Sequence, residues 1–123
     1  MTSKDIYTKN KQIKEAEEVK DFNPYSAAKI YEEIGYYEKA IDLYKNKIEE
    51  VNFFRHDCIA IIKRIDEMLE ELENQKYKDN ESIEILTFSK EVYNNDLIKY
   101  EHQLLDINNS IESCSKRLNR DLK

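Results

Sequence analysis

The chain has 123 residues, of which 37% are charged, with one glycine, one proline, no tryptophan and a net charge of −6. So few turn-forming residues exclude an all-β sandwich or barrel, and the lack of a glycine-rich turn excludes a doubly wound α/β fold. The acidic balance disfavours general binding to a nucleic-acid backbone, which needs a basic face. The composition therefore predicts an all-α protein, and the length suits a single helical domain over residues 1–123.

The sequence also bears on where the protein resides. It starts MTSKDIYTKNK, without an apolar stretch, so we expect no secretory signal. The longest apolar run, residues 58–62, is far too short to span a bilayer. Two cysteines provide neither a C-x-x-C pair nor a disulfide framework. We therefore expect a cytoplasmic protein without membrane insertion.

The N-terminal segment, residues 1–20, is rich in lysine and glutamate and carries only a thin apolar stripe. This pattern predicts a helix over about residues 10–20, preceded by a frayed start. A clear break follows. Asn23 is a good N-cap residue, and Pro24 suits the first position of a helix, so a second helix is predicted to begin there.

The segment 21–52 predicts two helices that turn back on each other at Gly35, the one glycine of the chain. Glycine adopts the positive φ that often follows a helix end at little cost. Apolar residues recur at helical spacing on both sides of it: Ala27, Tyr31 and Ile34 before, and Tyr37, Ala40, Ile41, Tyr44 and Ile48 after. Three small residues, Ala27, Ala28 and Ala40, let the two backbones approach closely. These features indicate an αα-hairpin.

Residues 21–54 resemble a single tetratricopeptide (TPR) repeat, and are similar to the microtubule-interacting-and-transport domain at the same positions. The matching positions are a large residue late in the first helix, a glycine, an aromatic two positions later, an Ala-Ile pair and a second aromatic. They are Tyr31, Gly35, Tyr37, Ala40, Ile41 and Tyr44. The resemblance implies that the first helix lines a ligand groove. The role carries over to four residues, which we expect to face away from the second helix and to bind a partner: Tyr25, Lys29, Glu32 and Glu33.

Residues 53–72 continue in a heptad pattern of apolar residues. A second row widens this stripe: Phe54, Ile61 and Met68. A wide stripe predicts that the helix packs against more than one neighbour. The polar stretch 75–81 predicts a loop, after which Asn80 or Ser82 caps the next helix.

The most regular helical pattern runs over residues 83–118, where apolar residues alternate by three and four positions. Because the preceding loop is short, the two long helices are predicted to lie antiparallel, with their pairing centred near residue 79. This register places Leu118 beside Ile41. We therefore expect a long helical hairpin over 53–121 that braces the TPR-like hairpin in one antiparallel helical bundle.

No residue pattern indicates catalysis. His56, Cys58 and His102 provide zinc-ligand chemistry, but His56 lies about 200° around the helix from Cys58. Adjacent acidic pairs diverge on a helix and cannot form a general acid–base pair. We therefore expect no metal, no cofactor and no enzymatic activity.

Three functions remain open at this point. The first is an adaptor that binds a peptide or helix of a partner protein. The second is a self-associating structural or chaperone-like coiled coil, possible as a homodimer, which resembles prefoldin subunits in its two long helices. The third is a nucleic-acid regulator that uses the N-terminal lysines, which the interleaved glutamates disfavour. The sequence favours the adaptor and does not predict nucleic-acid binding.

Overall fold

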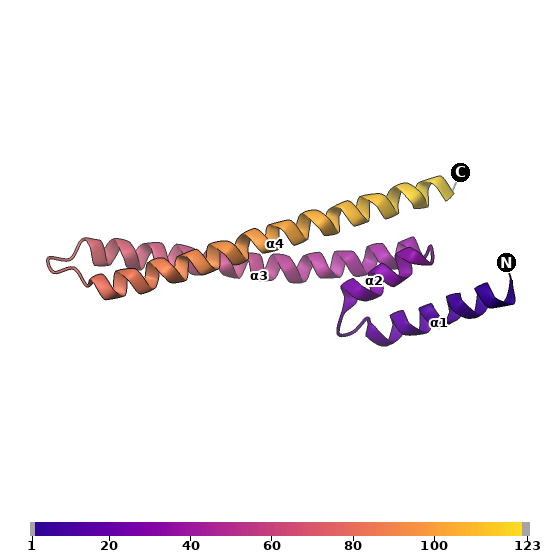
Figure 1. Ribbon diagram of the computed structural model, residues 1–123. Helices are drawn as coiled ribbons and strands as arrows, with labels where there is room; N and C mark the ends of the chain where they lie inside the picture. The colour runs from indigo at the N-terminus through magenta and orange to yellow at the C-terminus, as the bar shows by residue number, and fades with distance from the viewer. Residues whose placement is uncertain (1, 122–123) are drawn as a thin grey trace. The chain divides into compact units, whose positions relative to one another are not determined.

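A computed structural model describes residues 2–121 and contains four α-helices (Figure 1). They are α1 (Ser3–Val19), α2 (Pro24–Glu33), α3 (Tyr37–Glu73) and α4 (Asn80–Asp121). The described residues contain no strand, so the predicted all-α helical bundle is confirmed. Over the same residues, no helix is long and apolar enough to cross a membrane.

The helices form two compact units. The terminal unit comprises Met1–Glu50 and Leu105–Lys123, and the hairpin unit comprises Val51–Leu104. One domain over residues 1–123 stays a prediction, and residues 1 and 122–123 of that span lie outside the described part.

Helix α1 is longer than the sequence pattern predicted. The Thr2 hydroxyl accepts a hydrogen bond from the Asp5 backbone N–H at 3.2 Å, and the Asp5 carboxylate accepts one from the Thr2 backbone N–H at 3.2 Å. This capping box satisfies two free N–H groups and starts the helix at Ser3. The expected frayed start is therefore wrong: the cap, rather than the thin apolar stripe, decides where the helix begins.

The hairpin of α2 and α3 forms as predicted. Asn23 accepts a hydrogen bond from the Ser26 N–H at 3.1 Å, and Pro24 occupies the first helical position. Gly35 has a φ of +85°, the left-handed conformation that the sequence required there. The three small residues of this hairpin are fully buried, which permits close backbone approach: Ala27, Ala28 and Ala40.

Helix α3 runs without a break across the boundary that the sequence pattern placed at residues 52–53. The second helix of the hairpin and the following long helix are therefore one helix. No glycine or proline lies between Tyr37 and Glu73, so nothing in the sequence ends the helix at the change of apolar pattern.

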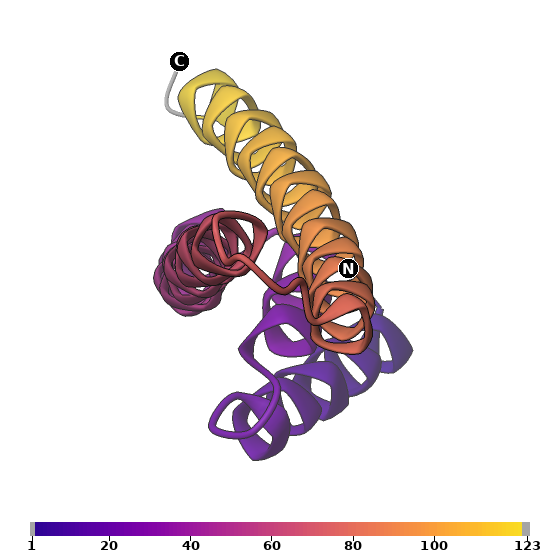
Figure 2. The ribbon, with the colours of Figure 1, turned by 90° about the vertical axis from the view of Figure 1, so that its left-hand side faces the viewer.

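In the hairpin unit, α3 and α4 lie antiparallel and are joined by a short loop, which faces the viewer in Figure 2. Two ion pairs define the register: Arg55 with Glu101 at 3.9 Å, and Asp66 with Lys90 at 2.6 Å. Both pairs straddle residue 78, which confirms the predicted pairing centre to within one residue.

The cap of α4 is a different residue from those expected. The Asp79 carboxylate accepts hydrogen bonds from the Ser82 backbone N–H at 3.1 Å and from the Ser82 hydroxyl at 2.7 Å. Asp79 is therefore the N-cap, and the prediction of Asn80 or Ser82 is wrong. All three residue types favour this role, so their order along a polar loop does not identify the cap.

Candidate functional site

The four residues predicted to bind a partner do not share one exposed surface. The ring of Tyr25 meets that of Tyr44 on α3 edge-on, with centroids 5.8 Å apart. Glu32 accepts a hydrogen bond from the Tyr44 hydroxyl at 2.7 Å. Tyr25 and Glu32 thus lie against α3, and the expectation that they face away from it is wrong. Lys29 and Glu33 are exposed.

The physical reason is that α2 is covered over a wide arc. Ala28 is buried together with Ala27 and Tyr31. Tyr25 and Glu32 lie three residues before and four residues after Ala28, on the same helical face. A short helix between two neighbours therefore retains only a narrow exposed strip, which a pattern drawn for one neighbour does not reveal.

A cluster around Glu32 joins α2 and α3 to the last turns of α4. Burial, followed by the nearby Glu32 carboxylate, raises the pKa of the Tyr44 hydroxyl well above its usual range. Burial and the same carboxylate raise the pKa of the Cys114 thiol to about 11. Both groups therefore hold their protons at neutral pH. A protonated, fully buried thiol is a poor nucleophile, so this cluster is suited to packing rather than to covalent chemistry.

The end of α4 makes further contacts in the terminal unit. The Arg117 guanidinium lies 5.9 Å from the centre of the Tyr37 ring and donates a 3.5 Å hydrogen bond to its hydroxyl. Leu118 lines a hollow together with Gly35 and Tyr37, at the start of α3. The predicted packing of this tail against the α2–α3 hairpin is confirmed.

Polar and cation–π contacts help to hold helix α1 against its neighbours. The Glu17 carboxylate accepts hydrogen bonds from Lys20 at 2.8 Å and from the Tyr31 hydroxyl at 2.7 Å, and Lys20 has the larger part in lowering the pKa of Glu17. The Lys9 ammonium lies 4.9 Å from the centre of the Tyr36 ring. The contacts to Tyr31 and Tyr36 add to the packing of a helix whose one buried residue is Ala16.

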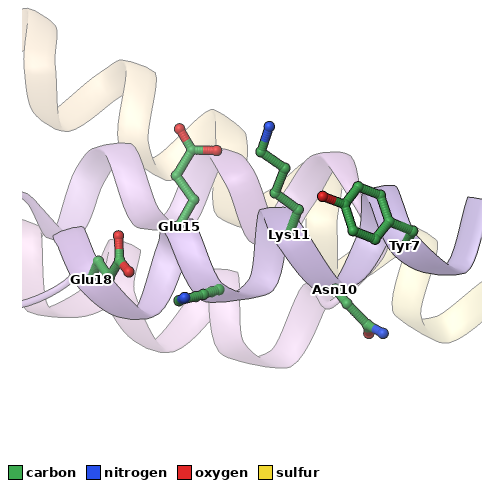
Figure 3. Close-up of a pocket in the computed structure, with 6 residues that line it drawn as sticks. Tyr7, Asn10, Lys11, Glu15 and Glu18 are labelled. Atoms are coloured by element: carbon green, nitrogen blue, oxygen red, sulfur yellow. The ribbon is translucent and has the colours of Figure 1, made fainter.

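A surface hollow of about 680 Å³ lies along α1 (Figure 3). Its lining residues are all exposed: Tyr7, Asn10, Lys11, Lys14, Glu15 and Glu18. Figure 3 shows Lys11 and Glu15 pointing to one side of the helix and Asn10 to the other. Because these groups do not converge on a shared point, the hollow lacks the arrangement of a catalytic or small-molecule site.

The three residues considered as zinc ligands differ in their exposure to solvent. His56 and His102 are exposed, whereas Cys58 is buried. Burial raises the pKa of the Cys58 thiol. Across residues 2–121, no group of three or more His, Cys, Asp and Glu side chains is placed to hold a metal ion.

The most prominent surface feature belongs to the hairpin unit and was not identified as a site from the sequence. We define the open apolar face as two rows of side chains, one from each helix: Phe54, Ile61 and Met68 of α3, and Ile85, Phe88 and Val92 of α4. Phe88 is 67% exposed and Ile85 is 59% exposed. The row in α3 is the one from which the sequence predicted a second neighbour; within the hairpin unit, α4 is the one helix that packs against α3.

Two contacts bring members of these rows next to the other helix. Toward the loop, Met68, Leu72 and Ile85 line one hollow of about 380 Å³. Toward the other end, the ring of Phe54 stacks on that of Tyr100, with centroids 6.1 Å apart. Met68 and Ile85 therefore lie on the same side of the hairpin unit near the loop, and Phe54 faces α4 at the other end.

Acidic residues flank this face. Five exposed carboxylates lie one helical step from residues of its apolar rows: Asp57 and Glu71 of α3, and Glu81, Glu84 and Glu91 of α4. Glu84 and Glu91 are next to Phe88 and also lie one step from Thr87, on another side of α4. One basic residue, Arg64, lies one step from both Ile61 and Met68. The hairpin unit holds seven Lys and Arg against twelve Asp and Glu, so it carries −5 of the net charge of −6.

Comparison with family models, curated proteins and solved structures finds no match for this chain.

Proposed function

We propose that the chain is a non-catalytic protein-interaction module that binds a helix of a partner protein on the open apolar face. The single observation that carries this proposal is a set of large apolar side chains in two helical rows, of which Phe54, Ile85, Phe88 and Val92 are exposed and Ile61 and Met68 are half-buried. Soluble proteins seldom leave such rows uncovered unless another surface packs on them.

The spacing of the rows favours a helix as the occupant. Phe54, Ile61 and Met68 follow one another at seven-residue intervals, or about 10.5 Å at 1.5 Å per residue. A third helix packed along two antiparallel helices presents side chains at the same interval. An extended peptide would instead need an exposed strand edge for its backbone hydrogen bonds, and the described residues contain no strand.

The α2–α3 hairpin adds a second part to the proposal. We interpret it as TPR-like from its residue pattern, and the exposed Lys29 and Glu33 stay as candidate contacts for a partner protein. Tyr25 and Glu32 take a supporting role, because they lie against Tyr44.

Affinity capture from a native lysate tests the proposal. Phe88→Glu places a charge in the α4 row of the open apolar face, and Thr87→Glu is the matched control, since Thr87 is exposed on another side of α4. We expect Phe88→Glu to lose a specifically captured protein that the wild type and Thr87→Glu retain. Equal capture by all three proteins would refute a role for this face.

The alternative function is self-association through the same face. Sedimentation at micromolar concentration distinguishes it: a wild-type dimer that Phe88→Glu converts to a monomer would favour a self-associating coiled coil over an interaction module.

A further inference from the structure

We propose that two copies of this chain associate through α1, with the two α1 helices lying antiparallel along an exposed strip of charged side chains. This inference goes beyond the proposed function, because the strip belongs to the terminal unit, whereas the open apolar face belongs to the hairpin unit.

The charged strip consists of four residues on one side of α1: Lys11, Lys14, Glu15 and Glu18. The two lysines are three positions apart, as are the two glutamates, and each lysine precedes a glutamate by four positions, so the four side chains are neighbours on the helix surface. All four are exposed, and the hollow along α1 is lined by residues of α1 alone (Figure 3). This side of α1 is therefore open to another molecule.

The charges of the strip are not used within the chain. Among the described residues, none of the four forms an ion pair. The helix dipole favours acidic residues in the first turn of a helix and basic ones in the last turn. The last turn of α1 instead contains Glu17 and Glu18 and no basic residue, and the lysines of the strip lie before its glutamates. The stability of α1 by itself therefore does not account for this order of charges.

A second copy of the strip matches this order. A half-turn about a point between Lys14 and Glu15 exchanges position 14 with position 15 and position 11 with position 18. Each lysine of one copy then lies opposite a glutamate of the other, which is the self-complementary arrangement that a two-fold dimer requires. A uniformly anionic partner, such as a membrane surface or a nucleic acid, would be repelled by Glu15 and Glu18.

Exposed aromatic rings lie beyond both ends of the strip. Tyr7, which is 70% exposed, precedes the strip by four positions, and Phe22, which is 76% exposed, follows it by four. The same half-turn brings the Tyr7 end of one helix to the Phe22 end of the other, where the rings add apolar area to the contact. The strip from Lys11 to Glu18 is about 10.5 Å long, and exposed ion pairs contribute little, so we expect a weak dimer with a Kd on the order of 10⁻⁴ M.

Sedimentation equilibrium of the full chain, from about 10 µM to about 1 mM, measures this association. Lys11→Glu/Lys14→Glu makes the strip entirely acidic, and Glu15→Lys/Glu18→Lys makes it entirely basic. We expect each variant alone to dimerise at least about tenfold more weakly than the wild type. An equimolar mixture of the two should form a heterodimer about as tightly as the wild type forms its dimer, because each lysine again lies opposite a glutamate.

A control variant and salt test whether the strip itself is responsible. Lys45→Glu/Lys63→Glu reverses two exposed lysines of α3, changes the net charge as much as the acidic variant does, and should alter the Kd less than about threefold. Raising the salt concentration from about 0.05 M to about 0.3 M should weaken the wild-type dimer. Circular dichroism establishes that each variant keeps its helical content.

The outcomes separate this inference from the proposed function. A wild type that stays monomeric at about 1 mM would overturn the inference. A dimer that the strip variants retain, that their mixture does not restore, that salt leaves unchanged or that the control variant weakens equally would also overturn it. A dimer that Phe88→Glu dissociates would place the contact on the open apolar face, which again overturns it. The capture experiment with Phe88→Glu and Thr87→Glu tests the proposed function separately, since neither variant changes the strip.

Discussion

The hydrogen bond between Tyr44 and Glu32 offers a direct test of how the terminal unit is held together. Tyr44→Phe removes one hydroxyl and preserves the ring, including its edge-on contact with Tyr25 at 5.8 Å. The lost bond is 2.7 Å long, and the ring that carries it is fully buried. Hydrogen bonds to charged groups contribute about 1.5–3 kcal/mol. Because Glu32 is half-buried and regains water when released, we expect the free energy of unfolding to fall by about 1–2 kcal/mol.

Urea unfolding followed by circular dichroism at 222 nm measures this change, and Tyr7→Phe on the exposed side of α1 serves as the matched control. A double-mutant cycle with Glu32→Gln isolates the pair, and we expect a coupling energy of at least about 0.5 kcal/mol. A loss for Tyr44→Phe below about 0.3 kcal/mol, with the urea dependence unchanged, would refute the view that this bond fastens α2 to α3.

Three further predictions concern the same fold. Gly35→Ala should destabilise the protein by about 1–2 kcal/mol, because an added Cβ meets no neighbouring atom but the left-handed backbone is strained; a neutral result in urea unfolding would contradict this. Ile107→Ala should lower the free energy of unfolding by about 2–4 kcal/mol, because Ile107 is buried. Leu104→Ala should lower it clearly less, because Leu104 is only half-buried; equal losses would contradict the observed burial. The pKa of Tyr31 is raised to about 12, first by burial and then by Glu17, so between pH about 10 and 12 the unfolded chain releases a proton that the folded one keeps. Stability should therefore fall as the pH rises through this range, and Tyr31→Phe should flatten the fall in urea midpoints; an unchanged slope would count against it.

The sequence predicted those parts of the fold that depend on local chemistry or on long apolar patterns. The predicted helix cap, first helical position and positive-φ turn are found at Asn23, Pro24 and Gly35, respectively. Each of these positions requires particular residue types, so the sequence identifies them. The antiparallel register follows from the short loop. The cap at Thr2 was missed because a thin apolar stripe was weighed above a threonine that precedes an aspartate by three positions. The length of α3 did not follow from the sequence, because a change of apolar pattern after residue 52 does not show whether a helix ends there.

The candidate site was less predictable, because it depends on which neighbours are present. Tyr25 and Glu32 were assigned to a free surface from a pattern that considers two helices. The row of Phe54, Ile61 and Met68 was recognised, but as the place of a second neighbour within the chain. A periodic pattern shows that one side of a helix is apolar. It does not show whether another segment of the same chain packs against that side.

This distinction connects the stability of the hairpin unit with its proposed role. Among the described residues, eight of the eleven buried apolar side chains belong to the terminal unit, whereas the hairpin unit has three: Val51, Cys58 and Ile65. Two helices with so few buried residues gain little from their own core, because most of their apolar seam remains partly accessible to water. A helix bound along the open apolar face would shield that seam as well as the face itself. Because a ligand that binds only the folded state stabilises it in proportion to the logarithm of its concentration over its Kd, partner binding and the order of the hairpin unit are thermodynamically coupled.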